Sequence, residues 1–295
     1  MTKRFAVPVP DAKWYSDVPR ARSEPNQRPR PAVAVRRRRR VAGLKFSTWN
    51  VNGIRARAAQ VVAWLEAEAP DVACLQEIKA SPEQVPEALQ AVGYHTAWHG
   101  HKGYSGVALM LRAARFAPPT FFHPPFDLEN RIVAATVDRV TYASVYIPNG
   151  GKSYETKVTF LRALAAWAGE LAADGQHLVL GGDYNVARTD ADVHPSERRP
   201  VIGQSREERG LVDQLFSHSL VDVGRLVEPD NDRLFTWWAP WRNMRQRNIG
   251  WRLDYIAAHA GLVDEAVHCA TYRDVGTSDH APVIAHLRDT PRPAC

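Results

Sequence analysis

The 295-residue sequence predicts an α/β protein in which two β-sheets pack against each other and helices cover their outer faces. Two observations predict this arrangement. Segments with strand character outnumber long segments with helical spacing. Pairs of neighbouring strands also alternate with single helices, whereas one parallel sheet would need a helix between successive strands. No internal repeat is visible, so a repeat architecture is not indicated.

The first half of the body alternates strands with single helices. Residues 44–49 alternate apolar and polar side chains, which is typical of a strand. Val61 and Leu65 lie at helical spacing within residues 58–68. Residues 82–92 are expected to form a helix with a proline in its first turn. The other strands expected here are 71–75, 105–111, 131–137 and 141–147.

The second half contains the longest predicted helix, over residues 153–173. Val158, Leu161 and Leu164 lie on one face of it, which indicates packing against a sheet. A second helix is expected over 206–216. The strands expected in this half are 177–180, which runs into Gly181-Gly182, then 251–257 and 282–287.

The charge of the chain is concentrated at its start. Residues 1–43 contain 12 Lys and Arg against three Asp and Glu, a balance of +9, although the whole chain carries only +6. The same stretch has six prolines and no apolar period. We expect a disordered basic arm over 1–43, one catalytic domain over 44–288 and a short tail over 289–295. The arm is more simply explained as a solvated leader, or as the product of an upstream start codon, than as a source of loose attraction to phosphate.

Several classes of protein are excluded by composition. No window approaches 18 consecutive apolar residues, so neither a membrane span nor a membrane partner is expected. The N-terminus lacks the apolar core of a signal peptide. Cys74, Cys269 and Cys295 have no zinc or disulfide spacing, which favours reduced thiols and a cytoplasmic location.

Polar side chains follow several of the predicted strands directly. Active sites concentrate where a rigid scaffold delivers strand ends to loops, so these residues are candidates for one site. They are Asn50 and Asn52 after Trp49, Glu77 after Leu75, Asp183 and Asn185 after Leu180, Asp254 after Leu253, and Asp279 and His280 after Ser278.

Carboxylates and amides with one histidine suit a hard divalent cation. Mg²⁺ takes oxygen ligands, usually one or two carboxylates with water and substrate phosphate. Zinc would need more His or Cys. The chain has no Gly-x-x-x-x-Gly-Lys-Ser/Thr motif and no Gly-x-Ser-x-Gly motif, so a P-loop nucleotide site and an ordinary serine hydrolase are not indicated.

Seven motifs in order give the chain a resemblance to one family. They are 49–57 (WNVNGIRAR), 75–77 (LQE), 103–107 (GYSGV), 146–149 (YIPN), 182–185 (GDYN), 248–255 (NIGWRLDY) and 278–280 (SDH). The chain resembles the exonuclease III family of apurinic/apyrimidinic endonucleases, within the endonuclease/exonuclease/phosphatase superfamily. The resemblance covers residues 44–288.

The resemblance implies a four-layered α/β sandwich, with two β-sheets flanked by helices. It implies Mg²⁺-dependent hydrolysis of DNA phosphodiesters, 5′ to an abasic site or from a 3′ end of double-stranded DNA, with Mn²⁺ as a possible substitute metal. A monomer is the family expectation. The metal-side residues implied are Glu77 as the main carboxylate, with Asn52, Asp183, Asn185, Asp279 and His280.

Catalytic roles are implied for a second, overlapping set. Asp183 matches the residue that activates or orients the attacking water. Asn50, Tyr146 and Asn185 match residues that hold the phosphate or its transition state. Asp254 and His280 match a paired carboxylate and imidazole, in which the opposite charge of Asp254 favours the protonated form of His280.

Substrate recognition is implied for residues around these. The positions of Trp237, Trp251 and Leu253 receive a flipped, baseless sugar in the family, and an apolar pocket of that size excludes a base. Lys102, Tyr104, Arg131 and Asn149 are expected on the substrate side. Residues 129–131 are Glu-Asn-Arg where the family usually has Glu-Gly-Arg. Trp238 is expected in the core.

Each of these residues has a simpler explanation when taken alone. Asn50 and Asn52 could form turns, Glu77 could cap a helix, and His280 could be a core histidine. Two alternative functions are also open. One is a phosphoesterase that acts on inositol phosphates or phospholipid headgroups, and the other is a DNA-binding module without catalytic activity. Residues 103–105 (GYS) and the Trp-rich run before Trp251 favour DNA over the first alternative, and the intact carboxylate and histidine set argues against the second.

Overall fold

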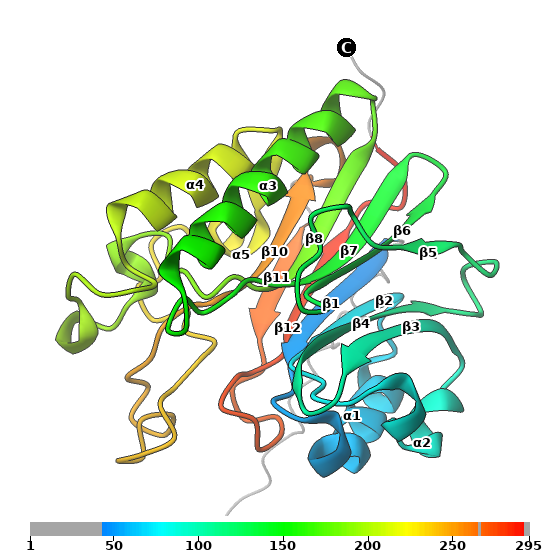
Figure 1. Cartoon of the computed structure of the whole chain (residues 1–295), viewed down its shortest axis with the longest axis horizontal. Helices are drawn as coiled ribbons and strands as arrows, with labels where there is room; N and C mark the ends of the chain where they lie inside the picture. The colour runs from blue at the N-terminus through cyan, green and yellow to red at the C-terminus, as the bar shows by residue number, and fades with distance from the viewer. Residues whose placement is uncertain (1–42, 265–266, 292–295) are drawn as a thin grey trace, which may run out of the picture. The chain divides into compact units, whose positions relative to one another are not determined.

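The computed structural model describes residues 43–264 and 267–291, which form two six-stranded β-sheets (Figure 1). The predicted basic arm falls almost wholly on residues 1–42, outside the described residues, and most of the predicted tail falls on 292–295. Both therefore stay predictions. In the part of the chain that the structure describes, every helix is too short or too polar to cross a membrane.

The first sheet has the strand order β11-β12-β1-β2-β4-β3. Its central pair, β1 and β2, is parallel, and the neighbours on both sides are antiparallel. The strands are β1 (Leu44–Asn50), β2 (Val72–Gln76), β3 (Tyr94–His101), β4 (Tyr104–Arg112), β11 (His268–Thr271) and β12 (Val283–Leu287).

The second sheet has the order β5-β6-β7-β8-β10-β9 and repeats this plan. Its central pair, β7 and β8, is parallel, and the outer strands are antiparallel. The strands are β5 (Phe121–Phe122), β6 (Ile132–Val137), β7 (Val140–Tyr146), β8 (His177–Asp183), β9 (Leu220–Asp222) and β10 (Asp254–His259).

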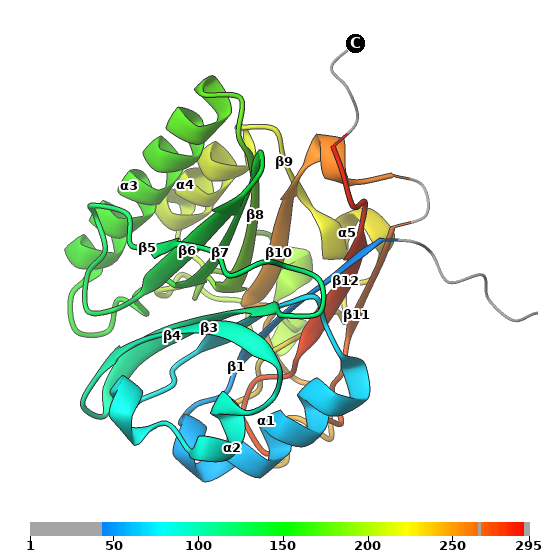
Figure 2. The same ribbon diagram turned by 90° about the vertical axis from the view of Figure 1, so that its right-hand side faces the viewer.

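Helices cover the outer faces of the two sheets (Figures 1 and 2). Helices α1 (Ile54–Glu68) and α2 (Glu87–Gln90) lie over the first sheet, and α3 (Tyr154–Ala173) and α4 (Arg206–Phe216) over the second. A short helix, α5 (Val223–Val227), follows β9. The predicted four-layered α/β sandwich is confirmed.

The main core lies between the sheets. Phe46 of β1 stacks on Tyr142 of β7 with ring centroids 6.4 Å apart. A side chain at Gly181 of β8 would place its Cβ 2.5 Å from the Phe46 ring. The glycine is therefore needed because the two sheets approach closely just before the polar end of β8.

Two pairs of parallel strands end on the same side of the sandwich. In the first sheet Asn50 pairs with Gln76 at the ends of β1 and β2. In the second, Tyr146 pairs with Asp183 at the ends of β7 and β8, and Asp254 begins the antiparallel β10 opposite Asp183. This topology brings residues distant in the sequence to one edge of both sheets.

Most element predictions are confirmed within a few residues, but two are wrong in part. The helix predicted over 82–92 is a 3-10 turn (Pro82–Gln84) followed by the single-turn α2, because Pro86 interrupts it. The strand predicted from 251 begins only at Asp254, since Trp251 makes isolated bridges to Val193 and Trp237 instead. Strands β3, β5, β9 and β11 and helix α5 were not expected.

Candidate active site

Asn50 links the ends of three strands at the candidate site. Its side-chain nitrogen donates hydrogen bonds to Glu77 Oε1 and Asp183 Oδ2, both at 2.9 Å. Asn50 is buried at the end of β1, Glu77 follows β2, and Asp183 ends β8 in the other sheet. One amide thus holds two carboxylates in place across the two sheets, which no single turn would achieve.

Three of the site residues have left-handed backbone. The φ angles of Asn52, Glu77 and Asn185 are 44°, 50° and 51°. Such angles are uncommon for non-glycine residues and least so for asparagine, so the glutamate conformation is the most strained. Strain of this kind persists where the surrounding structure requires it, and it is frequent at functional sites.

His280 is held between two carboxylates. Its Nδ1 lies 2.8 Å from Asp254 Oδ2, and its Nε2 lies 3.8 Å from Asp183 Oδ2. The Ser278 hydroxyl donates to the Asn50 carbonyl at 2.7 Å and accepts from the His280 N–H. The predicted Asp254–His280 pair is therefore present, and Ser278 orients the turn that carries it.

Glu77, Asp183 and His280 form a group that can hold a metal ion. One donor atom of each lies within 4.8 Å of the others. Asn185 is close by, because its backbone N–H donates to Asp183 Oδ1 at 2.9 Å and its side-chain nitrogen to the Ile147 carbonyl at 2.8 Å. The two carboxylates of this group supply the oxygen ligands that Mg²⁺ prefers.

Asp279 lies beside this group, but both of its oxygens are engaged. Its Oδ1 accepts from the Asn52 amide at 2.8 Å, and its Oδ2 accepts from Trp237 Nε1 at 3.1 Å. The ammonium of Lys79 contacts Asn52 Oδ1 at 2.6 Å and Glu77 Oε2 at 2.7 Å. Lys79 was not predicted, although it lies only two residues after Glu77.

Tyr146 and Tyr104 flank the guanidinium of Arg131. The Arg131 group lies 4.7 Å from the Tyr146 ring centroid and donates to the Tyr104 hydroxyl at 3.1 Å. Asn130 has a φ of 60°, in the region that glycine favours and asparagine tolerates. Asn130 therefore forms a left-handed turn just before Arg131, at the position where the family usually has glycine.

Trp237 and Trp251 form an apolar wall next to His280. Their rings meet edge to face at 5.8 Å, and the Trp237 ring lies 6.4 Å from the His280 ring. Leu253 is buried, and its N–H donates to Thr236. Trp238 is buried in the core, as expected.

Lys102 and Asn149 lie at the rim. Both are exposed, in the β3–β4 and β7–α3 loops. The Asn149 side-chain oxygen accepts from the Gly151 N–H at 3.0 Å, while the Lys102 N–H donates to Ser81 Oγ at 3.2 Å. These contacts do not involve the group around His280.

Burial and neighbouring charges shift the pKa values of the site. Burial raises the pKa of Asp183 to about 7, helped by the Asp254 and Glu77 charges and opposed by His280. Burial alone would lower the pKa of His280, but the Asp254 and Asp183 charges raise it to about 10. Burial also acts to raise the pKa of Glu77, yet hydrogen bonds from Asn50 and Lys79 hold it below its usual range.

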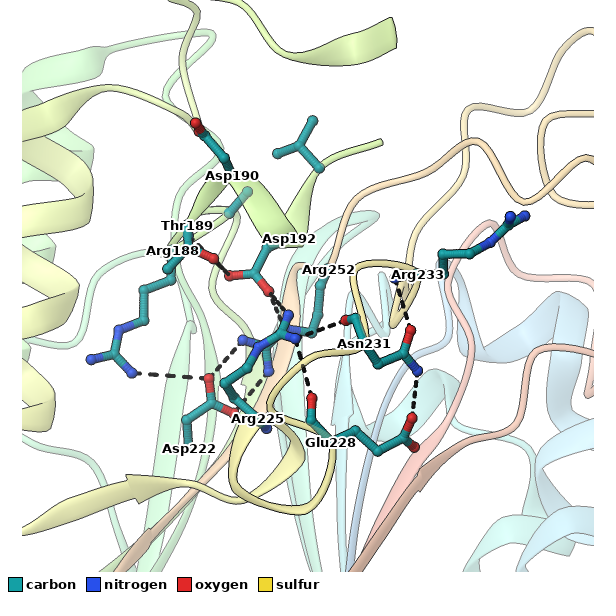
Figure 3. A network of polar contacts seen from close by, with 12 residues as sticks. Arg188, Thr189, Asp190, Asp192, Asp222, Arg225, Glu228, Asn231, Arg233 and Arg252 are labelled. Atoms are coloured by element: carbon teal, nitrogen blue, oxygen red, sulfur yellow. Dashed lines mark hydrogen bonds and ion pairs between the residues drawn. The ribbon is translucent and has the colours of Figure 1, made fainter. Parts of the chain in front are cut away.

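A buried charge network supports the chain just before Asp254. The Arg252 guanidinium donates to Asp192 Oδ1 at 2.7 Å and to the two oxygens of Asp222 at 2.8 and 2.6 Å (Figure 3). Arg225 donates to the same Asp192 oxygen at 2.6 Å. These contacts fix the segment between Trp251 and Asp254, so the apolar wall and the His280 partner share one rigid support.

The fold and the site define a phosphoesterase-type α/β sandwich, and comparison with known proteins agrees. The model of the endonuclease/exonuclease/phosphatase family matches residues 47–280. The chain belongs to this family, as its motifs predicted. It is 32% identical over 252 residues to an exodeoxyribonuclease of Bacillus subtilis, covering 81% of this chain and 98% of the relative.

Solved structures lead to the same branch of the family. A 3′ phosphatase from Neisseria, bound to a product DNA hairpin, matches with a TM-score of 0.74 and 33% identity, over 83% of this chain and 99% of the other. An AP endonuclease from Archaeoglobus fulgidus matches with a TM-score of 0.73 and 27% identity, over 84% and 100%. The prediction of an exonuclease III-like enzyme is confirmed at the level of this class.

Proposed function

We propose that this protein is a Mg²⁺-dependent DNA-repair phosphodiesterase that cleaves DNA 5′ to abasic sites and removes nucleotides or blocking groups from 3′ ends. The observation that carries the proposal is the meeting of Glu77, Asp183 and His280 donor atoms within 4.8 Å. The named relatives act in the same chemistry: an exodeoxyribonuclease, a 3′ phosphatase and an AP endonuclease.

Glu77 would be the main carboxylate on the metal ion, with Asn52, Asp183, Asn185, Asp279 and His280 as the metal-side set around it. When bound there, Mg²⁺, or Mn²⁺ in its place, would supply positive charge against the phosphodiester and the leaving oxygen. The carboxylate-rich donor set supports this choice over zinc. Hydrogen bonds from Asn50 and Lys79 lower the pKa of Glu77, so its carboxylate is ionised and able to bind a cation.

Asp183 is our candidate to accept the proton of the attacking water. It is buried, its backbone neighbour Asn185 fixes one oxygen, and a pKa near 7 suits a general base at neutral pH. His280 stays protonated beside Asp254 and is therefore a phosphate clamp rather than a base.

The remaining polar groups are assigned to the phosphate. Asn50, Asn185 and Tyr146 carry N–H or O–H donors beside the two carboxylates. Donors placed before the reaction stabilise the charge that develops on the non-bridging oxygens. Burial raises the pKa of Tyr146, so its hydroxyl keeps its proton and can donate.

Substrate selection is assigned to the aromatic wall and the Arg131 loop. Trp237, Trp251 and Leu253 would receive a bare deoxyribose and exclude a base. Arg131, Tyr104 and Lys102 would contact the duplex backbone, with Asn149 at the same rim. Phosphate contacts of this kind position the DNA without reading its sequence.

Three further assignments belong to this proposal. The protein acts as a monomer on double-stranded DNA, and residues 1–43 form a basic arm outside the catalytic domain over 44–288. A cytoplasmic location is supported by Cys74 and Cys269, which are both free thiols.

The test is an incision assay on matched abasic, nicked and intact duplexes, with Mg²⁺ and with chelator. We expect incision of the abasic strand, or shortening from the nick, only with metal. No incision with Mg²⁺, or undiminished incision with chelator, would defeat the proposal. Faster hydrolysis of an inositol phosphate than of abasic DNA would instead favour the alternative phosphoesterase.

A further inference from the structure

A second group of metal-ligating side chains lies at the edge of the first sheet, away from the catalytic carboxylates. It consists of His99 on β3 and His123 and Asp127 in the loop between β5 and β6, and we call it the His99 cluster. One donor atom of each side chain lies within 4.8 Å of the others. His99 Nε2 is 2.6 Å from Asp127 Oδ2.

Asp127 is oriented by the backbone. Its Oδ1 accepts the N–H groups of Arg131 at 2.8 Å and Ile132 at 3.0 Å. The carboxylate therefore cannot turn freely, and Oδ2 is directed at the histidines. The side chains of His99 and Asp127 are only 16% and 15% exposed, so the pair is largely withdrawn from water.

His123 is held in the tautomer that a metal ligand requires. Its Nδ1 lies 3.2 Å from the Ile132 carbonyl, which can only accept, so Nδ1 carries the hydrogen. The other nitrogen, Nε2, then has a free lone pair. Histidine ligands commonly donate their second ring N–H to a backbone carbonyl in this way.

The two imidazoles are stacked. Their ring centroids lie 3.7 Å apart with an interplanar angle of 20°. Each lone pair lies in the plane of its own ring, so the rings turn out of this stack when they share one ion. His99 and His123 also come from different elements, so a shared ligand would join the loop to the sheet.

We propose that His99, His123 and Asp127 bind a divalent transition-metal ion, Zn²⁺ being the ion that fits best. Two imidazoles and one carboxylate with a fourth position for water are a common zinc ligand set. Imidazole nitrogen also favours zinc over Mg²⁺, which distinguishes this site from the carboxylate-rich catalytic group. When the ion binds, the distance between each pair of donor atoms must become about 3.3 Å, which is the distance between neighbouring ligands of a tetrahedral zinc ion.

Such a site would stabilise the loop that presents Arg131. The Arg131 N–H is bonded to the same Asp127 carboxylate, and the Arg131 side chain contacts Tyr104 and Tyr146. A metal on Oδ2 restrains the carboxylate from the opposite side. Occupancy therefore fixes the start of β6 without touching the catalytic residues.

The experiment is a titration of the full-length protein with Zn²⁺ by isothermal calorimetry, with excess Mg²⁺ present throughout to compete at the catalytic group. The variants are His123→Gln, whose side chain is exposed, and Asp127→Asn, which keeps an oxygen for the two backbone N–H groups. His101→Gln is the matched control, because His101 is exposed on the same strand and lies outside the cluster. Residues 1–42 contain no His or Cys that would add a zinc site.

We expect wild type and His101→Gln each to bind one Zn²⁺ ion. His123→Gln and Asp127→Asn should lose this binding or bind the ion at least about tenfold more weakly. A zinc-edge anomalous peak beside His99 in crystals of the wild type is the second expected result. Equal zinc binding by wild type and His123→Gln, or no zinc binding under excess Mg²⁺, would overturn the proposal. The cluster would then be a hydrogen-bonded support for the loop.

Discussion

Lys157 Nζ lies 2.6 Å from Glu208 Oε1, and both side chains are fully buried where α3 meets α4. The same ammonium donates to the backbone carbonyl of Asn185 at 2.7 Å. Glu208 in turn accepts the Gly203 N–H through both oxygens at 2.8 Å. One ion pair thus ties two helices to the left-handed turn that carries Asn185.

Removal of one partner of this pair is expected to be strongly destabilising. Glu208→Ala leaves the Lys157 ammonium buried without a counter-charge, which costs about 3–5 kcal/mol of unfolding free energy. Urea unfolding measures this directly. The double variant Lys157→Met, Glu208→Leu removes both charges and should recover much of the loss. A single variant as stable as wild type would contradict the assignment.

Glu77 and Asp183 are expected to separate metal binding from turnover. Glu77→Ala removes a metal-side carboxylate, so the Mg²⁺ concentration needed for half-maximal incision should rise at least about tenfold. Asp183→Asn removes the candidate base while keeping the shape, so turnover should be lost and DNA binding retained. Single-turnover incision measures the chemical step, and fluorescence anisotropy measures DNA binding. Loss of DNA binding with intact single-turnover chemistry would reverse the role given to Asp183.

The Asp254 charge is expected to set the alkaline limit of activity. His280 has a pKa of about 10. In wild type its imidazolium form is therefore present throughout the neutral range and loses its proton only as the pH rises through 10. Asp254→Asn removes a charge that raises this pKa while burial still lowers it, so the alkaline limb of kcat/KM should move down by about one unit or more. A pH–rate profile checks this, and an unshifted limb would exclude His280 as the titrating group.

Acid stability is expected to depend on Asp192. Burial acts to raise the pKa of this carboxyl, but Arg252 and Arg225 hold it below the usual range. Because the folded-state pKa is lowered, the ionised carboxylate contributes its full unfolding free energy above about pH 4. This contribution is lost as the pH falls through the folded-state pKa. Asp192→Asn should therefore lose about 3 kcal/mol at neutral pH and show a flatter acid limb.

The control for this variant is Asp213→Asn. Asp213 pairs with Arg188, but its side chain is 59% exposed, so its removal should change unfolding free energy by less than about 1 kcal/mol. Urea unfolding of both variants between pH 3 and 7 makes the comparison. Equal losses at the two positions would mean that the buried network does not stabilise the fold.

Deletion of residues 1–42 is expected to leave incision intact. The segment carries a balance of +9 against a net charge of +6 for the whole chain, so its removal should make DNA affinity less dependent on salt. Incision rates at two salt concentrations compare the chains. If the truncated protein is folded but inactive, the catalytic domain begins before residue 44.

Sequence predicted the scaffold well wherever local chemistry was decisive. The alternation in β1, the apolar face of α3, and the polar residues after β1, β2 and β8 all depend on neighbours within a few positions. Strand β3 was missed because Tyr94–His101 is polar on much of its length, as a half-exposed strand at the sheet edge can be.

The site was predicted as a set of residue types, but its connections were not. Motif order indicated that Glu77, Asp183 and His280 share one site. That the Asn50 amide bridges two carboxylates, that Lys79 holds Glu77, and that Lys157 is a buried charge within an apolar helix face were not predictable.

The sequence by itself determined the alternation of strands and helices, the family and the candidate chemistry, because these depend on side-chain types and their local order. Only the tertiary structure decided which atoms meet and which charges are buried. Asn50 and Asp183 are 133 positions apart, so their contact exists only once two sheets have packed. The pKa values of Asp183 and His280 follow from that same packing, since burial and opposing charge act through space and not along the chain.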